Sequence, residues 1–246
     1  CHATRSAEVK WKEIRNDMLT PLALKNANIF FACSHMAGDS LFGKRPYTVI
    51  HNALDLSVFR YQPHIREMMR RELNLEGKFV IGTVGRLAHQ KNPYFALDVF
   101  REVLKRQKNA VYLWIGSGPL DAQVRQYAEE LHLGEHMRFL GNREDVDQLY
   151  QVMDVFFLPS LYEGLPVVGI EAQACGLPVV VSDTVTKEMK VTDGVFYIAL
   201  EDEKAKWADI LLQNQDRTLE KTTDELKKRG YDIRKEAEKL SNLYKR

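Results

Sequence analysis

The sequence predicts an α/β fold in which a parallel β-sheet is covered by helices on both faces. Between residues 78 and 182, short apolar runs alternate with segments of helical length, and this alternation is typical of βαβ units. The chain has 246 residues, of which 45% are hydrophobic. A sizeable core is therefore expected, in one large domain or in one and a half smaller ones.

The first part of the chain is expected to contain smaller elements. Residues 6–26 have a helical pattern that Pro21 interrupts, and the apolar run at 29–34 is typical of a buried parallel strand. A short helix ending at 42, a strand at 47–50 and a turn at 51–55 should follow. Residues 63–75 are predicted to form a charged helix.

The regular part is expected to start at residue 78. Strands are predicted at 79–84, 110–115, 137–140, 155–158 and 178–182, the last of which closes the series, with helices at 93–105, 120–131, 145–153 and 166–175. Three helices should follow residue 202, and the last, 232–245, is interpreted as a solvated surface helix. Parallel sheets bind ligands beyond the carboxyl ends of their strands, so chemistry is expected in the loops after 84, 115, 140 and 158.

Composition limits the function classes. The formal net charge of +1 argues against a dedicated nucleic-acid binder. The sequence contains no apolar run long enough to span a bilayer and no signal-peptide pattern. Cys1, Cys33 and Cys175 are interpreted as reduced, buried thiols, which indicates a reducing, cytoplasmic compartment.

The loop after the first regular strand combines cations with helix-start signals. Asn92 is a good N-cap and Pro93 suits the first helical turn. Arg86 and Lys91 would then lie near a helix N-terminus with free backbone N–H groups, an arrangement that fits a diphosphate. The alternative is a capped surface loop with two solvated cations.

The loop and helix at 159–176 carry two carboxylates. The helix is apolar nearly all round and should be buried, so the carboxylate of Glu171 needs hydrogen bonds, which a ribose diol would provide. Glu163 lies beside Gly164, where backbone N–H groups are free. Two carboxylates suit a polyol ligand; the alternative is that Glu171 pairs with a basic residue in the core.

Two further motifs are weaker. Gly116 and Gly118 begin like a dinucleotide fingerprint that lacks its third glycine, and we interpret them as a tight turn that lets a ligand approach the backbone. Asp145 and Asp147 have the spacing of a divalent-metal motif. Because they fall in a predicted first helical turn, capping is favoured and no metal site is expected.

Several segments together resemble the family 4 glycosyltransferases, especially their bacterial capsule and exopolysaccharide branch. The resemblance rests on motifs in the family's order: the linker-like run at 51–59, Gly-Arg-Leu and Lys-Asn within 85–92, the run at 115–120, Arg-Phe-Leu-Gly at 138–141, and two glutamates eight residues apart at 163 and 171. One departure is Ala53, which stands where the family's linker usually has glycine.

The resemblance implies a GT-B fold, with two facing Rossmann-like domains and an active site in the cleft between them. Residues 1–57 would be the remnant of the amino-terminal, acceptor-side domain with the linker, so the chain would be truncated at its amino terminus. Residues 58–229 would be the carboxy-terminal domain that binds the nucleotide-sugar donor, and residues 230–246 a terminal helix.

Roles for individual residues also follow from the resemblance. Arg86 and Lys91 would hold the donor diphosphate and Glu163 the sugar ring, and these three are the expected catalytic residues. The remaining donor-binding residues would be Gly85, Gly118, Arg138, Leu140, Gly164, Leu165, Pro166 and Glu171.

The implied activity is transfer of a hexose, with retention of configuration, from a UDP-, GDP- or ADP-linked sugar to a saccharide or lipid-linked oligosaccharide. No cofactor and no metal are expected, because cations and the helix dipole would stabilise the leaving diphosphate. We expect a cytoplasmic enzyme, compatible with peripheral contact at the inner face of the membrane, and little transfer by this chain alone. The alternatives are a nucleotide-binding module without catalysis and a sugar-nucleotide epimerase on a related fold.

Overall fold

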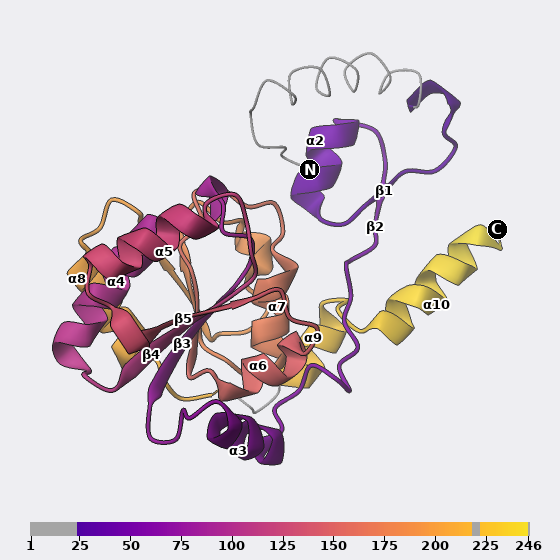
Figure 1. Cartoon of the computed structure of the whole chain (residues 1–246). Helices are drawn as coiled ribbons and strands as arrows, with labels where there is room; N and C mark the ends of the chain where they lie inside the picture. The colour runs from indigo at the N-terminus through magenta and orange to yellow at the C-terminus, as the bar shows by residue number, and fades with distance from the viewer. Residues whose placement is uncertain (1–23, 218–221, 246) are drawn as a thin grey trace.

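The computed structural model describes residues 24–217 and 222–245, and the helix expected at 6–26 lies almost entirely outside them. A six-stranded parallel sheet forms the centre of the larger lobe (Figure 1). Its order is β5-β4-β3-β6-β7-β8, and the strands are β3 (Phe79–Val84), β4 (Ala110–Ile115), β5 (Met137–Gly141), β6 (Val155–Leu158), β7 (Val179–Ser182) and β8 (Val195–Ile198). The predicted α/β class is confirmed.

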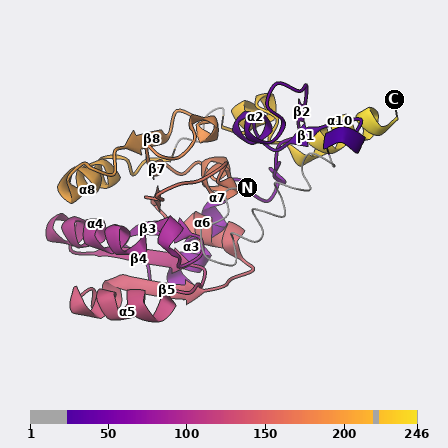
Figure 2. The ribbon, with the colours of Figure 1, turned by 90° about the horizontal axis from the view of Figure 1, so that it is seen from above.

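Helices cover both faces of this sheet (Figure 2). One face carries α4 (Pro93–Arg106), α5 (Asp121–Glu130) and α8 (Lys204–Gln213), and the other carries α3 (Pro63–Glu72), α6 (Val146–Val152), α7 (Val167–Ala174) and α9 (Thr222–Lys228). Successive side chains of a strand point to opposite faces. In β4, Tyr112 and Trp114 therefore belong to the core under α4, α5 and α8. Leu113 and Ile115 belong to the core on the opposite face.

Strand β8 was not predicted. The last predicted strand was 178–182, but β8 pairs in parallel with β7 along its whole length, from Val179↔Val195 to Ser182↔Ile198. The connection between these two strands contains only the short 3₁₀ turn η3 (Lys187–Met189). Without a full crossover helix in between, the alternating pattern that identified the other strands was lost.

A smaller lobe precedes the main one. Its strands β1 (Phe31–Ala32) and β2 (Thr48–Val49) pair in parallel, and α2 (His35–Phe42) connects them. The Oγ of Ser34 accepts a hydrogen bond from the amide of Ala37 and caps α2. Glu188 in η3 of the main lobe also accepts bonds from the amides of His35 and Met36, each of 2.8 Å. The carboxylate of Glu188 thereby connects the two lobes.

The last helix, α10 (Ile233–Tyr244), packs against the linker rather than simply facing water. Leu54 pairs with Asp232 in a parallel bridge, and the amide of His51 donates to the carboxylate of Glu236, which is buried. The expectation of a solvated surface helix is therefore wrong for one face of α10. The chain passes between the two lobes twice, once through the linker around Leu54 and once at Asp232 before α10. These two adjacent segments are the crossings between the lobes. The predicted domain boundaries at 57 and 229 remain predictions.

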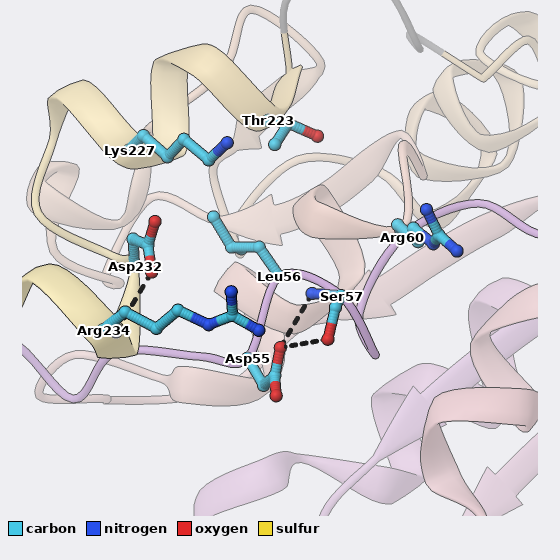
Figure 3. Close-up of a pocket in the computed structure, with 8 residues that line it drawn as sticks. All are labelled: Asp55, Leu56, Ser57, Arg60, Thr223, Lys227, Asp232 and Arg234. Atoms are coloured by element: carbon cyan, nitrogen blue, oxygen red, sulfur yellow. Dashed lines mark hydrogen bonds between the residues drawn. The ribbon is translucent and has the colours of Figure 1, made fainter.

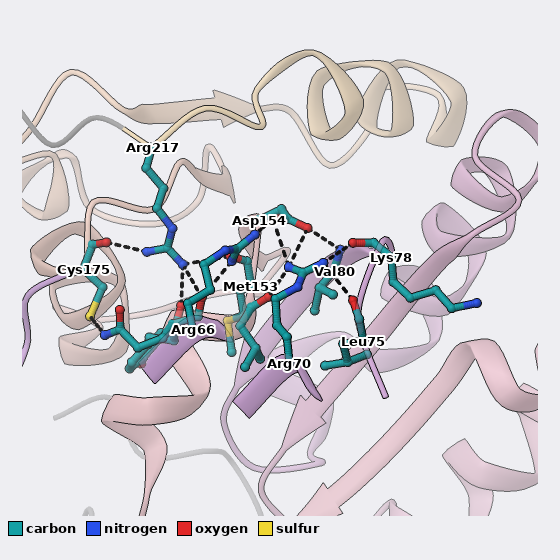
Figure 4. Close-up of polar contacts among 12 residues, drawn as sticks. Arg66, Arg70, Leu75, Lys78, Val80, Met153, Asp154, Cys175 and Arg217 are labelled. Carbon is teal, nitrogen blue, oxygen red and sulfur yellow. Dashed lines mark hydrogen bonds and ion pairs between the residues drawn. The ribbon is translucent and has the colours of Figure 1, made fainter. Parts of the chain in front are cut away.

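Three arginines hold the amino edge of the main sheet around Asp154 (Figure 4). Arg66 and Arg70, both on α3, form ion pairs with Asp154, whose other oxygen accepts the amide of Val80 at 2.7 Å. Arg217 donates to the carbonyls at the end of α6, and its burial lowers its pKa to about 10. Cations are favourable at helix C-termini, so this cluster fixes α3, α6 and the start of β6 together.

The cysteines differ in their environment. Cys175 is a buried free thiol, as expected, and burial raises its pKa to about 12. Cys33 is a free thiol that is only partly buried, which corrects the expectation for this residue, and Cys1 lies outside the described residues. Within residues 24–217 and 222–245, no helix is long and apolar enough to cross a membrane.

Candidate active site at the carboxyl edge of the sheet

The strand order identifies where a ligand should bind. From β3 the chain moves outward through β4 to β5 and then returns to place β6 on the other side of β3. Such a reversal leaves a crevice outside the carboxyl ends of the two strands that flank it. The loops after β3 and β6 meet at this crevice, and they are the two loops that the sequence identified as most informative.

The first loop begins its helix differently from the prediction. Residues His89–Lys91 form the 3₁₀ turn η1, and Asn92 follows in the left-handed conformation with φ of 52°. Asn92 occupies the N-cap position of α4, as predicted, but its side chain makes no capping hydrogen bond. Asparagine tolerates this conformation better than most residues, which explains its presence here. Pro93 does occupy the first helical turn, as predicted.

Arg86 and Lys91 have different environments. Arg86 is exposed, and its guanidinium forms no hydrogen bond or ion pair with any residue that the structure describes. The Nζ of Lys91 lies 2.6 Å from Oε1 of Glu163, in a pair whose side chains are only 13% and 9% exposed. Lys91 is therefore fixed by the opposite loop, while Arg86 is free to bind an anion.

Glu163 is the meeting point of the two loops. Besides Lys91, its carboxylate accepts hydrogen bonds from Oγ of Ser160 at 2.9 Å and from Nε2 of Gln90 at 3.1 Å. The backbone joins the same loops, because the amide of Leu161 donates to the carbonyl of Gln90. These contacts hold the carboxylate of Glu163 between the two loops.

The turn between β6 and α7 offers open space and unused donors. A Cβ added at Gly164 would meet no atom within 4 Å. The backbone N–H groups of Glu163, Gly164 and Leu165 make no hydrogen bond with the described residues, and Pro166 leads directly into α7. Free amides before a helix favour oxygen ligands with negative charge.

Glu171 lies near the middle of α7, partly buried, with a hydroxyl as its partner. Its Oε2 accepts a hydrogen bond of 2.8 Å from the phenol of Tyr150, and burial raises the pKa of Glu171. Among the described residues no cation pairs with Glu171. The alternative prediction, a basic partner in the core, is therefore wrong. Its Oε1 makes no hydrogen bond with these residues and is available to a ligand hydroxyl.

The glycines of the second loop allow it to pack closely against the loop after β3. A Cβ at Gly118 would lie 2.3 Å from the carbonyl oxygen of Leu87, and one at Gly116 would lie 2.3 Å from that of Gly85. The amide of Leu120 donates to the same Leu87 carbonyl. The close approach that we predicted for a ligand is therefore made by the loop after β3, which these contacts hold in place.

Of the two predicted donor-binding residues on β5, Arg138 turns away from the carboxyl edge. Arg138 stands near the start of β5, opposite Leu113 of β4, and its guanidinium donates to the carbonyl of Leu73 at the end of α3. Leu140, the last residue but one of β5, lies near the carboxyl end of the strand and is partly buried. Gly141 ends the strand, and its carbonyl accepts the amide of Gly116 at 2.7 Å.

The aspartates after β5 are structural. Asp145 stands at the start of α6, as predicted, but its side chain makes no capping bond. It instead forms two hydrogen bonds with Arg143, of 2.8 and 2.6 Å, and these lower the pKa of Asp145. In the part of the chain that the structure describes, no three acidic, histidine or cysteine side chains are grouped to hold a metal ion.

Three residues of the site were missed by the sequence analysis. Gln90 and Ser160 orient Glu163, and Tyr150 orients Glu171. Ser160 lies three residues before Glu163, and Gln90 is next to Lys91. Their position beside predicted site residues could have indicated that these two polar side chains belong to the site. Tyr150 comes from another helix, and no local pattern indicates its contact.

Comparison with known proteins is consistent with this geometry. Residues 65–231 match the family described as "Glycosyl transferases group 1". The chain is 31% identical to the putative glycosyltransferase EpsF of Bacillus subtilis, over 99% of the chain and 67% of that protein. It is 30% identical to the Escherichia coli UDP-Gal:alpha-D-GlcNAc-diphosphoundecaprenol alpha-1,3-galactosyltransferase, over 80% of the chain and 53% of that enzyme.

Solved structures give the same fold. The crystal structure of Anabaena HepE in complex with UDP and glucose matches with a TM-score of 0.81 at 22% identity, over the whole of this chain and 70% of HepE. At this identity the match establishes the fold alone, and it confirms the predicted architecture. The chain spans about two thirds of EpsF and about half of the Escherichia coli enzyme.

Proposed function

Because this chain belongs to the group 1 glycosyl transferase family, we propose that its carboxyl-edge site binds a nucleotide sugar and that the whole enzyme transfers the hexose with retention of configuration. The observation that carries this proposal is the buried Lys91–Glu163 pair at the reversal of strand order. The turn at 163–165, which includes Glu163, offers free amides. The loop after β3, which includes Lys91, carries the exposed and unpaired Arg86.

Each group has a chemical role in this proposal. Negative charge grows on the diphosphate as its bond to the sugar breaks, and Arg86 and Lys91 stabilise that charge. Glu163, already oriented by Ser160 and Gln90, accepts hydrogen bonds from sugar hydroxyls. The backbone of Gly164, Leu165 and Pro166 lines the sugar site. The free Oε1 of Glu171 accepts a ribose hydroxyl, while Tyr150 holds the other oxygen.

Among the candidate donors, the comparisons favour a UDP sugar. HepE was crystallised with UDP and with UDP-glucose, and the Escherichia coli relative is named for UDP-Gal. The name of that relative also includes a diphosphoundecaprenol acceptor, which favours a lipid-linked saccharide and action at the inner face of the membrane. In this proposal the product contributes to a surface polysaccharide.

The proposal is tested by changing Glu163 in the full-length parent. Glu163→Gln keeps a hydrogen-bonding group beside Lys91 but removes the charge, so we expect sugar transfer to fall by about a hundredfold or more, with UDP affinity little changed. Glu135→Gln, at an exposed position after α5, is the matched control. Undiminished transfer by Glu163→Gln would favour a nucleotide-binding module, and release of an epimerised sugar without acceptor would favour an epimerase.

This chain alone is proposed to bind donor but to transfer little sugar. Complementation of a strain that lacks the full-length parent gives the test. We expect no restoration of polysaccharide by residues 1–246, whereas full restoration would overturn this part of the proposal.

A further inference from the structure

A hollow of about 300 Å³ lies where the chain crosses between the lobes (Figure 3). The linker forms one wall, and α9 with the start of α10 forms the other. Backbone bonds of 3.0 Å join these crossings beside it, from the amide of Leu54 to the carbonyl of Tyr231 and from the amide of Ile233 to the carbonyl of Leu54. Among the described residues, the lining of this hollow shares none with the carboxyl-edge site.

Three cationic residues from three different segments line this hollow. Arg60 lies between the linker-like run at 51–59 and α3, Lys227 belongs to α9 and Arg234 to α10, and in Figure 3 Arg234 extends toward Asp55 and Ser57. None of the three side chains forms a hydrogen bond or ion pair with a residue that the structure describes. Unpaired cations around one hollow suit an anion with several oxygens, such as a phosphate.

Two carboxylates line the same hollow and define the rest of the ligand. Oδ1 of Asp55 accepts bonds from the amide and hydroxyl of Ser57, and Oδ1 of Asp232 accepts the amide of Arg234. The second oxygen of each carboxylate makes no hydrogen bond with the described residues. Such oxygens repel a bare phosphate but accept hydrogen bonds from hydroxyl groups.

We propose that this hollow binds a phosphorylated monosaccharide that bridges the linker and the α9–α10 segment. The cations bind its phosphate and the free oxygens of Asp55 and Asp232 bind its hydroxyls. The volume lies at the lower end of the range for small-molecule pockets, which suits a monosaccharide phosphate better than a nucleotide sugar. A ligand here would restrict relative motion of the two crossings.

Calorimetric titration with glucose 6-phosphate tests the proposal. We expect Lys227→Gln to weaken binding about tenfold or more, while Lys228→Gln has no effect, because Lys228 is an exposed neighbour on α9 that does not line the hollow. Saturation with UDP should leave the affinity unchanged, since UDP occupies the other site. Glucose and inorganic phosphate should each bind at least about tenfold more weakly than the sugar phosphate.

Hydrogen exchange gives a second readout of the bridge. Glucose 6-phosphate should slow exchange at the amides of Leu54 and Ile233, which join the crossings, in the native chain but not in Lys227→Gln. Absence of binding at millimolar concentration, equal loss in Lys228→Gln, or displacement by UDP would overturn the proposal. Equal affinity for inorganic phosphate would overturn the role of the two carboxylates. Each of these outcomes is independent of whether the carboxyl-edge site binds UDP.

Discussion

At the scale of single residues, the two carboxylates of the carboxyl-edge site are held in opposite ways. Glu163 has a cation and two further donors around it, whereas Glu171 is partly buried with only the phenol of Tyr150 as partner among the described residues. A buried charge without a cation costs stability. Glu171 is therefore expected to favour ligand binding at the expense of the stability of the empty protein.

Glu171→Gln should separate these two effects. Burial raises the pKa of Glu171 in the folded chain, so the charged form destabilises the fold as pH rises through the unfolded-state pKa, and fully so above the folded-state pKa. We expect the variant to melt at a higher temperature than the native chain at pH 8 and at nearly the same temperature at pH 4, with weaker UDP binding. Thermal melts across pH measure this, and a lower melting temperature at pH 8 would contradict it.

Lys91→Ala should destabilise the chain through the carboxylate that it leaves behind. Removing one partner of a buried pair costs about 3 kcal/mol, and Lys91 and Glu163 are both largely buried. Arg86→Ala, which removes an exposed and unpaired cation, should change stability by less than about 0.5 kcal/mol. Urea unfolding compares the two, and similar losses would contradict the difference in environment.

The sequence located residues such as Arg86, Lys91, Glu163 and Glu171 because loops after buried strands follow from local patterns. It could not determine their partners. The contact between Glu171 and Tyr150 joins two helices. Arg138 donates to the carbonyl of Leu73, which packing of α3 places beside β5. Contacts of this kind depend on how elements pack, which periodicity does not encode.

At the scale of elements, glycines determine how the loops of the site pack. Gly118→Ala would place a Cβ against the backbone of Leu87, and such overpacking costs about 1–3 kcal/mol. Gly164→Ala has open space around its new methyl group, so it should leave the free energy of unfolding unchanged. If the sugar ring lies over this turn, Gly164→Ala should nevertheless weaken binding of UDP-glucose more than that of UDP. Unfolding curves and calorimetry of both variants measure these effects, and the reverse order of stability would contradict the packing.

The arginine cluster at the opposite edge provides a test of the framework itself. Asp154→Ala would leave Arg66 and Arg70 without their carboxylate and the amide of Val80 without its acceptor, at a cost of about 3 kcal/mol. In the control Glu76→Ala, the lost pair with Arg71 is exposed on both sides and should cost less than about 1 kcal/mol. Chemical denaturation distinguishes the two, and equal costs would show that the cluster does not stabilise the fold.

Strand β8 marks the limit of prediction at this scale. The strands from β3 to β7 follow helices or precede them in a regular alternation, and their predicted bounds differ from the observed ones by at most one residue. The segment Val195–Ile198 is apolar enough for a strand, but no full helix separates it from β7. Pairing across the sheet, rather than local sequence, makes it the sixth strand.

At the scale of the whole molecule, a larger lobe built on the six-stranded sheet is joined to a smaller lobe through two crossings. The strand order places the loops after β3 and β6 at the reversal of the sheet, while Asp154 and its arginines hold the other edge. The central claim is that this edge binds the diphosphate of a nucleotide sugar.

Calorimetric titration of UDP into the native chain and into Arg86→Ala, each with and without EDTA, tests that claim most directly. Because Arg86 is exposed and unpaired, its loss should leave the fold intact while removing a diphosphate contact. We predict one UDP per chain, the same affinity with and without the chelator, and binding at least about tenfold weaker in Arg86→Ala. No binding by the native chain, or equal binding by both proteins, would contradict the account.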